Sequence, residues 1–331
     1  MKIVLIGGSG LLGYESILNL SNYEVLAFSL PNIPKDLNIP SNTTMIFKDY
    51  TTLSDEELLH YLKDAYGLIF AAGIDERIQS NSPIYELYEQ INITPLKRLL
   101  TLAKQAHLKS VVICGSYFSY FDRLWPHLNL YQTHPYIRSR VDQANMALSF
   151  ADDNFSVSII ELPYIFGIQN GREPVWTILV DILLKQKERT LYSKGGTTMI
   201  TKKQASQAII GALFNAKTNH YPIGYYNMDN ASFLKIVHQG LGINRPIYLV
   251  PNCLFKLYTR RLSNINKRKN IHTGLDLTKF HKLQTKHLFI DKEIAHTLGV
   301  KDDDIKSMII DSIKLSKEIL ETKKKVTKMT Y

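Results

Sequence analysis

The sequence predicts an α/β fold: a doubly wound, mainly parallel sheet with helices on both faces, followed by a smaller C-terminal α/β lobe. Three observations predict it. Short apolar runs alternate with amphipathic segments of helical length, which is the pattern of repeated βαβ units. The apolar runs are continuous in Val, Ile and Leu, as in strands that are buried on both faces. A glycine-rich turn directly follows the first of these runs.

The elements of the first half follow one another in regular order. Ser54, followed by three acidic residues and an apolar periodicity, predicts a helix start, and Pro83 lies near the start of a long helix. The expected strands are 2–6, 24–28, 44–48, 67–73, 110–115 and 156–162. The expected helices are the segment from Leu11, then 54–63, 83–106 and 135–151.

The second half is less regular. The expected helices are 174–186, 201–215, 231–241 and 302–321, and a strand is expected at 225–228. The polar and basic stretch 262–275 is expected to be a mobile loop. A length of 331 residues is typical of two domains, and the pattern places them at 1–165 and 166–331.

The net charge of +10 arises from the last 87 residues, which hold 19 Lys and Arg against 9 Asp and Glu. This excess either meets an anionic partner or forms a solvated face with a frayed C-terminus. Nucleic acid is not favoured, because the chain lacks zinc-finger spacing and a stacking-aromatic signature. The basic clusters are Arg260, Arg261, Lys267, Arg268 and Lys269, and the tail Lys323, Lys324, Lys325 and Lys328.

The cysteine count and the lack of long apolar stretches argue against a disulfide-rich protein and against a membrane-spanning one. Cys114 and Cys253 cannot form a disulfide framework, and a reducing, cytoplasmic compartment is expected. No run approaches the length of a membrane span. The ten histidines show no metal-ligand spacing, so no metal site is expected.

The strongest motif is the turn Gly7-Gly8-Ser9-Gly10-Leu11-Leu12-Gly13, which joins the first strand to the first helix. Glycines allow a tight turn that brings backbone amides against a pyrophosphate, and the helix N-terminus attracts the anion. Gly13 would let the helix lie close to the sheet. The strand before the turn and the helix after it provide the context that a dinucleotide site requires. The sequence therefore predicts a Rossmann-type dinucleotide-binding domain.

These features resemble the extended short-chain dehydrogenases/reductases, specifically the NAD(P)-dependent epimerase/dehydratase family, over residues 1 to about 242. Supporting motifs occur in the family's order: Asp49 in FKDYTT, Ala71-Ala72-Gly73, Asn92 in NITPL, Cys114-Gly115-Ser116, Pro163-Tyr164-Ile165-Phe166-Gly167 and Gly224-Tyr225-Tyr226-Asn227. The resemblance implies a nicotinamide cofactor, a substrate cleft between the lobes and some interleaving of the chain between them. It also implies a homodimer through the helices at 83–106 and 135–151. The expected cofactor-binding residues are Gly7, Gly10, Leu11, Leu12, Gly13, Ser29, Asp49, Tyr50, Ala71, Ala72, Gly73, Asn92 and Pro163.

The resemblance also implies a catalytic set of Ser116, Tyr136 and Arg140. Tyr136 would exchange a proton, Ser116 would hold the substrate oxygen, and a cation one helical turn on would favour phenolate. Arg140 stands where the family carries Lys, and its planar fork is not equivalent to an ammonium group. The implied function is hydride transfer on a sugar, on a nucleotide sugar or on another small carbonyl or alcohol. The alternative is a non-catalytic NAD(P)-binding sensor.

Further departures concern substrate and cofactor. Glu161 replaces an Arg of many relatives, and Lys203-Gln204 lacks the family's Asp. Arg172, Lys194, Lys202 or Lys203 either grips an anion or is an ordinary surface charge. After the second strand the chain offers Ser29 rather than a carboxylate, and Lys35 follows nearby. Since a carboxylate would repel a 2′-phosphate, the sequence leans slightly toward NADP over NAD.

Overall fold

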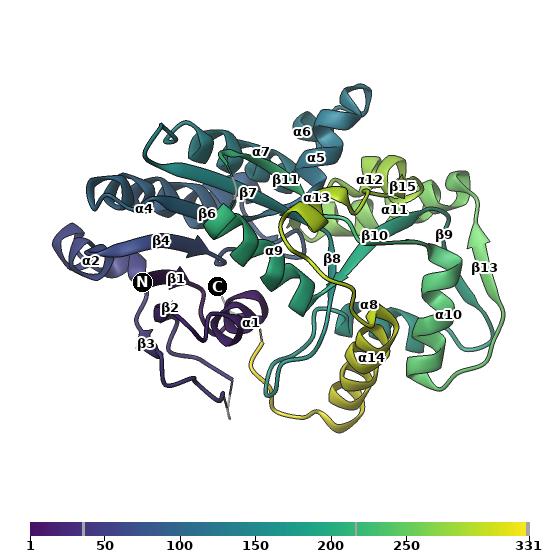
Figure 1. Cartoon of the computed structure of the whole chain (residues 1–331). Helices are drawn as coiled ribbons and strands as arrows, with labels where there is room; N and C mark the ends of the chain where they lie inside the picture. The colour runs from purple at the N-terminus through teal and green to yellow at the C-terminus, as the bar shows by residue number, and fades with distance from the viewer. Residues whose placement is uncertain (35–36, 216, 329–331) are drawn as a thin grey trace.

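The computed structural model describes residues 1–34, 37–215 and 217–328. Its centre is a seven-stranded, all-parallel sheet with the strand order β11-β7-β6-β4-β1-β2-β3. The order reverses between β1 and β4, which is the doubly wound topology that the sequence predicts (Figure 1). The strands are β1 (Lys2–Ile6), β2 (Glu24–Ser29), β3 (Thr43–Phe47), β4 (Ala65–Phe70), β6 (Ser110–Ser116), β7 (Ser156–Leu162) and β11 (Asn219–Pro222).

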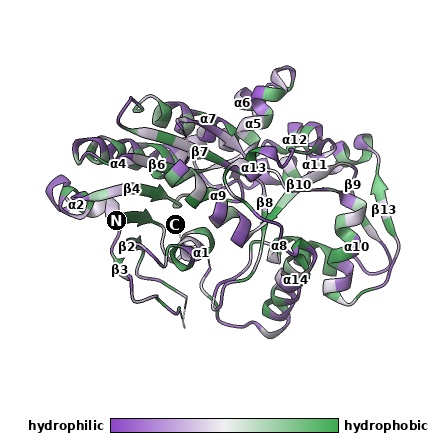
Figure 2. Cartoon of the chain, viewed as in Figure 1, coloured by the Kyte–Doolittle hydropathy of each residue, from purple (hydrophilic) through white to green (hydrophobic). Residues whose placement is uncertain are grey.

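Two cores lie on opposite faces of this sheet, because successive strand residues point to opposite sides. Ile3 and Leu5 of β1 pack toward one side, with Ile17 and Ile209, whereas Val4 and Ile6 pack toward the other. Helices α1 (Leu11–Asn19) and α9 (Lys202–Asn215) cover the first side. The second side carries α2 (Asp55–Leu62), α4 (Thr94–Gln105) and α7 (Pro135–Leu148). Figure 2 shows the central strands β1 and β4 as hydrophobic.

The helix expected at 83–106 is divided into α3 (Ile84–Tyr88), a π-helical turn η2 (Glu89–Ile93) and α4. Pro95 explains the division, because it has no N–H to donate to the carbonyl four residues earlier. Association of two copies through this segment and 135–151 stays a prediction. The short helices around the site are η1 (Tyr50–Thr52), α5 (Tyr117–Leu124), η3 (Pro126–Leu128) and α6 (Leu130–Thr133).

In the described part of the chain, three smaller sheets complete the fold. One has the order β12-β10-β15, with β8 also paired to β10; two further two-stranded sheets join β13 to β9 and β14 to β5. Their strands are β5 (Gln79–Ser80), β8 (Tyr164–Phe166), β9 (Thr190–Ser193), β10 (Gly196–Thr201), β12 (Tyr226–Asp229), β13 (Ile247–Val250), β14 (His272–Thr273) and β15 (His287–Leu288). The helices are α8 (Thr177–Leu184), α10 (Asn230–Leu241), α11 (Asn252–Arg268), α12 (Leu277–Gln284), α13 (Glu293–Thr297) and α14 (Ile305–Thr322).

Two expectations for this half are wrong. The stretch 262–275 is not a loop: its first part completes the 17-residue helix α11, and His272–Thr273 form β14. The C-terminal segment is not frayed as far as Thr327, whose N–H donates to the Gly171 carbonyl at 2.7 Å. The Thr327 carbonyl accepts from the Glu173 N–H at 3.0 Å, so this segment lies along residues 171–173.

The chain crosses more than once between the part built on the seven-stranded sheet and the smaller part, which contains the sheet of β8, β10, β12 and β15. Strand β11 and helix α9 belong to the large sheet although they follow β8 and β10 in sequence. The division at residue 165 stays a prediction. No helix among the described residues is long and apolar enough to cross a membrane.

Candidate active site

The β1–α1 turn has the tight geometry that its glycines predict. Gly7 has a φ of +94°, and a Cβ there would lie 2.8 Å from the Ala71 carbonyl oxygen. A Cβ on Gly13 would lie 2.1 Å from the Gly7 carbonyl oxygen, so α1 begins against the turn itself. The first helical hydrogen bond runs from the Tyr14 N–H to the Gly10 carbonyl at 2.8 Å. The N–H groups of Leu11, Leu12 and Gly13 precede it and lie where a helix N-terminus receives an anion.

Ser29 ends β2 and lies against this turn. Its hydroxyl donates to the Ser9 hydroxyl at 2.5 Å, and Ser29 is buried. Two residues of the loop after β8 reach the same place: the Gln169 side-chain amide and the Arg172 guanidinium each donate to the Ser9 carbonyl at 2.9 Å. Lys35, the other cation considered for this position, lies outside the described residues.

Gln169 and Arg172 each have a second polar atom directed away from these bonds. Gln169 Oε1 and Arg172 Nε are buried and have no hydrogen-bond partner within the part of the chain that the structure describes. Burial lowers the pKa of Arg172. A guanidinium held beside the glycine turn, with no ion pair to an acidic side chain within the described part of the chain, is suited to a phosphate. Sequence reasoning considered Arg172 only among several surface cations and missed Gln169.

Ala71, Ala72 and Gly73 continue from β4 past the glycine turn. Gly73 has a φ of +131°, and a Cβ there would lie 2.6 Å from Asn92 Oδ1. The fully buried Asn92 accepts from the Ile74 N–H at 2.8 Å and donates to the Ile74 carbonyl at 3.0 Å. Asn92 therefore fixes the backbone of the loop that follows β4.

The remaining cofactor candidates make local contacts. The Asp49 carboxylate accepts from the Thr51 N–H at 2.9 Å and from its hydroxyl at 2.7 Å, and so caps η1. Tyr50 packs edge-on against Phe70, and burial raises its pKa. Pro163 is buried between β7 and β8. Their contact with a cofactor stays a prediction.

The structure brings the three catalytic candidates together at the carboxyl edge of the sheet. Ser116 is the last residue of β6, and Tyr136 and Arg140 lie one turn apart in α7. The Tyr136 hydroxyl interacts with the Ser116 hydroxyl and with the Arg140 guanidinium, whose carbon lies 5.2 Å from the ring centroid. Burial raises the pKa of Tyr136, and the charge of Arg140 opposes that rise. Tyr136 is therefore protonated at neutral pH.

Arg140 also holds the loop that follows β4. It donates to the Ile74 carbonyl at 3.0 Å and to Gln143 Oε1 at 2.9 Å, and the Gln143 amide donates to the Asn92 carbonyl at 2.7 Å. Arg140 Nε is buried and has no hydrogen-bond partner among the described residues. A lysine could not make this fork of contacts, so Arg140 serves the loop as well as Tyr136.

Glu76 is a residue of the site that sequence reasoning missed. It follows Asp75 in the same loop, and burial raises the pKa of its carboxyl group, with the charge of Asp75 adding to the rise. Its charge contributes to the raised pKa values of Tyr117, Tyr136 and Tyr164, whose main cause is burial. The only signal in the sequence is the charged triplet Asp75-Glu76-Arg77 directly after a strand end.

A segment far along the chain covers Tyr136. We call residues 270–276, between α11 and α12, the strap. The Tyr136 N–H donates to the Gly274 carbonyl at 2.8 Å, and His134 Nδ1 accepts from the Asp276 N–H at 3.0 Å. Within the strap, β14 pairs antiparallel with β5. Beneath the strap Tyr136 is only 4% exposed, and burial lowers the pKa of His134 to about 4.

The residues that depart from the family pattern form ion pairs or hydrogen bonds within the protein. The fully buried Glu161 forms a two-pronged ion pair with Arg123, at 2.8 and 2.6 Å. Gln204 forms a reciprocal cap with Thr201 at the start of α9, at 3.0 and 3.1 Å. Lys202 pairs with Glu15 at 2.9 Å. These residues are therefore engaged within the protein.

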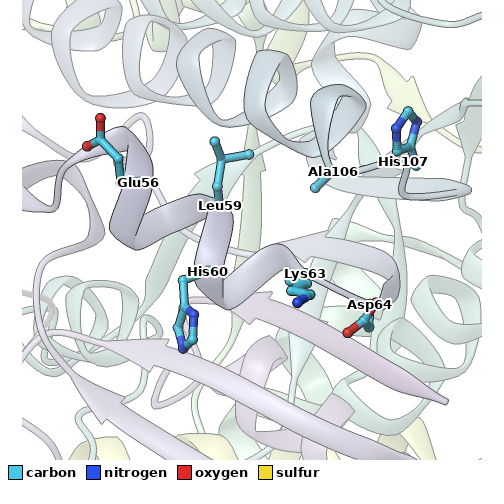
Figure 3. A pocket seen from close by; sticks show the side chains of 7 residues that line it. All are labelled: Glu56, Leu59, His60, Lys63, Asp64, Ala106 and His107. Carbon is cyan, nitrogen blue, oxygen red and sulfur yellow. The ribbon is translucent and has the colours of Figure 1, made fainter.

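Other kinds of site find little support. No group of three or more His, Cys, Asp or Glu among the described residues could hold a metal ion. Burial raises the pKa of Cys114 to about 12, which makes this thiol inert. A hollow of about 440 Å³ lies between α2 and the turn after α4 (Figure 3). Its residues Lys63, Asp64 and His107 precede β4 and β6, so it lies at the amino edge, opposite the site.

Solved structures with the same fold cover nearly the whole chain. A UDP-glucuronic acid 4-epimerase of Bacillus cereus, solved with NAD, is 14% identical with a TM-score of 0.67, and the match covers 96% of this chain and 99% of that one. A UDP-glucose 4-epimerase of Thermotoga maritima, solved with UDP-glucose, is 12% identical with a TM-score of 0.65, covering 97% and 100%. At these identities the likeness shows the fold. Several structures with this fold, among them the Bacillus cereus epimerase, were solved with NAD, and these structures do not support the slight preference for NADP expected from the sequence.

One curated protein resembles the chain in sequence, and no family model matches it. It is the decarboxylating sterol-4-alpha-carboxylate 3-dehydrogenase of Candida albicans, 27% identical over 165 residues. The match spans 46% of this chain and 44% of that protein, so the chain covers less than half of its relative's length. Together with the sheet topology and the full-length structural matches, it confirms the resemblance drawn from the motifs: the chain has the fold of the extended short-chain dehydrogenases/reductases and resembles their epimerase/dehydratase family.

Proposed function

We propose that the protein is a nicotinamide-dependent oxidoreductase, epimerase or dehydratase that acts on the alcohol or carbonyl of a sugar, with Tyr136 as the proton carrier. One observation carries the proposal. The Tyr136 hydroxyl meets Ser116 and Arg140 at the carboxyl edge of the same sheet whose β1–α1 turn offers the first-turn amides of a helix. Ligands of doubly wound sheets bind at this edge, beside the point where the strand order reverses.

The residues present fit a dinucleotide. Gly7 and Gly13 leave the turn open for close approach, and the amides of the first turn of α1 would receive the pyrophosphate. We assign Arg172 and Gln169 to the same ligand, because each keeps a buried polar atom free while bonded to Ser9. Arg172 would pair with a cofactor phosphate, either the pyrophosphate or a 2′-phosphate near Ser29. When bound, the nicotinamide supplies or accepts the hydride.

The proton chemistry follows from the state of Tyr136. Because burial raises its pKa, Tyr136 holds its proton at neutral pH and suits the role of an acid toward a carbonyl oxygen. Ser116 would orient that oxygen. For the reverse reaction Tyr136 must lose the proton, and Arg140 favours that loss by stabilising the phenolate.

Two substrate classes come from the comparisons. The structural relatives include enzymes solved with UDP-sugars, and the curated relative is named for a sterol carboxylate. We favour a nucleotide sugar as the first substrate to test, because the structural matches span both parts of the chain, whereas the sterol enzyme matches less than half of it. A sterol alcohol is the second.

A non-catalytic NAD(P)-binding sensor is the alternative, and two observations favour it. The strap leaves Tyr136 only 4% exposed, and Arg140 is engaged by Ile74 and Gln143. An Arg140→Lys variant separates the two functions. A gain in hydride transfer would support an enzyme, whereas unchanged nucleotide binding without turnover in either protein would support a sensor.

The first experiment is calorimetric titration of the purified chain with NAD, NADH, NADP and NADPH. Saturable binding of one pair is expected, and it selects the cofactor for a screen of UDP-sugars and sterol alcohols, read as a change in nicotinamide absorbance. Failure of all four nucleotides to bind would contradict both the enzyme and the sensor.

A further inference from the structure

The stretch between Asp229 and Asp276 contains no acidic residue. Its 46 residues hold eight Lys and Arg, which nearly account for the net charge of +10. None of these cations belongs to the catalytic set or to the dinucleotide site described above. The centre of the stretch is the 17-residue helix α11, which carries five of them.

Helix α11 presents apolar side chains to solvent. It packs against α12, and Thr259 is its buried residue. On the opposite side Leu254 is 53% exposed, Leu257 61%, Tyr258 53% and Ile265 38%. Spacings of three, four and seven residues place these side chains on one face. Single exposed apolar residues are ordinary, but four on one face of one helix are not.

Basic side chains share this outer face. Arg261 and Arg268 are exposed and follow Leu254 and Leu257 at helical spacing. The apolar surface also continues toward the N-terminus of α11, because Pro251 alone separates the helix from β13. There Tyr248 is 54% exposed, and Leu191, its register partner on β9, is 48% exposed. Figure 1 shows β9 and β13 at the outer edge of the smaller part.

The inner side of α11 is electropositive as well. Burial lowers the pKa of His281 on α12, and the charges of Lys256, Lys282 and Arg260 lower it further. Because Arg261 and Arg268 lie on the outer face, a second copy of this chain that docked face to face on α11 would bring like charges together. Nucleic acid would engage the cations but would gain nothing from exposed aliphatic side chains. An anionic bilayer surface matches both features, since apolar side chains enter the interface while Arg and Lys meet the headgroups.

We propose that the outer face of α11, with Leu254, Leu257, Tyr258 and Ile265 flanked by Arg261 and Arg268, docks on an anionic lipid bilayer, with the helix lying in the plane of the interface. This inference does not rest on the proposed catalytic function.

Flotation of the full chain with lipid vesicles tests the proposal. Binding is expected to vesicles containing about one third phosphatidylserine and not to phosphatidylcholine alone, and to weaken as salt rises from about 0.1 to about 1 M. The double variants Leu254→Gln/Leu257→Gln and Arg261→Gln/Arg268→Gln should each lower the partition coefficient at least about tenfold, because each removes one of the two attractive contributions.

The matched control is Ile178→Gln/Ile182→Gln. These residues lie four apart on α8, are 54% and 45% exposed, and lie outside the acid-free stretch, so vesicle binding should be unchanged. Circular dichroism checks that each variant is folded. The proposal is overturned if the wild-type chain ignores phosphatidylserine vesicles or if the Leu variants bind them equally well. It is also overturned if sedimentation shows a dimer that dissociates in the Leu variants.

Discussion

Arg172 is the residue whose position most directly tests the dinucleotide site. Its guanidinium is bonded to the Ser9 carbonyl, and its Nε is buried without a hydrogen-bond partner in the described chain. We expect Arg172→Gln to weaken nucleotide binding about tenfold or more, since a charge-assisted hydrogen bond contributes about 1.5–3 kcal/mol. Calorimetry with NAD and NADP shows which phosphate Arg172 contacts. A loss of affinity for both nucleotides indicates the pyrophosphate, and a loss of affinity for NADP alone indicates the 2′-phosphate.

Lys203 provides the control for Arg172. It is exposed at the start of α9 and was an equal candidate for an anion on sequence grounds. Lys203→Gln should leave both affinities unchanged. Equal affinities for the wild type and Arg172→Gln would remove Arg172 from the site.

Burial is the main cause of the raised pKa of Tyr136, and the charge of Glu76 adds to it. The carboxylate adds to the raised pKa of Tyr136, so Glu76→Gln removes a charge that disfavours phenolate and should lower that pKa. In an active enzyme the limb of the pH–rate profile that reports Tyr136 should move to lower pH. The substitution Glu86→Gln, at an exposed position on α3, should leave the profile in place. A Tyr136 limb that stays fixed in Glu76→Gln would contradict this electrostatic role.

At the level of elements, the strap explains how a distant segment closes the site. A Cβ on Gly274 would lie 2.1 Å from the Tyr88 hydroxyl and 3.1 Å from Tyr136 Cβ. Gly274→Ala should therefore displace the strap and break the hydrogen bond from the Tyr136 N–H to the Gly274 carbonyl. Hydrogen exchange of the Tyr136 amide should accelerate relative to the strands of the large sheet.

Gly242→Ala is the comparison for that experiment. Gly242 has a φ of +67° with open space around it, so alanine there costs about 1 kcal/mol of stability without touching the strap. It should raise exchange globally and leave the Tyr136 amide no faster than its surroundings. The same pattern in Gly274→Ala would mean that the strap does not shield Tyr136.

The elements also show what the sequence could and could not predict. Six strands of the large sheet were predictable because burial on both faces requires continuous apolar runs, whereas β11 was missed because Asn219–Pro222 has no such run. Ser116, Tyr136 and Arg140 were expected from the family resemblance, and helical spacing is consistent with the one-turn separation of Tyr136 and Arg140. The second half of helix α11 was missed because residues 262–268 are mostly polar and basic, with only Leu262 and Ile265 apolar, so this stretch has the composition of a loop. The strap was unpredictable because β14 pairs with β5, nearly 200 residues earlier in the chain.

At the scale of the whole molecule, contacts between distant parts of the chain complete the site. Gln169 and Arg172 meet Ser9 across more than 150 residues, and Thr327 holds the backbone beside Arg172. The strap connects α7 to the C-terminal part through His134 and Asp276. The local sequence pattern does not predict such contacts, because they depend on how loops from the large-sheet part and the smaller part pack together. The stability of the whole chain should consequently respond to the state of His134.

His134 should make the folded chain sensitive to acid. Its folded-state pKa of about 4 lies below the ordinary value of 6.5, so the unfolded chain binds the extra proton first as pH falls. The stabilising contribution is present above pH 6.5 and is lost progressively between pH 6.5 and about 4. By linkage this amounts to roughly 3 kcal/mol. Protonation at Nδ1 would also remove the acceptor for the Asp276 N–H.

His134→Asn tests this dependence, because the Asn side-chain oxygen can replace Nδ1 as the acceptor and does not titrate. Denaturant unfolding at pH 7 and pH 5 should show a smaller loss of unfolding free energy in His134→Asn than in the wild type. His127→Asn, at an exposed position, should lose as much unfolding free energy between pH 7 and pH 5 as the wild type does. Buried His238 and His281, whose pKa values are also lowered, retain part of the acid sensitivity in every variant. Identical losses in His134→Asn and the wild type would show that His134 does not couple the strap's closure to pH.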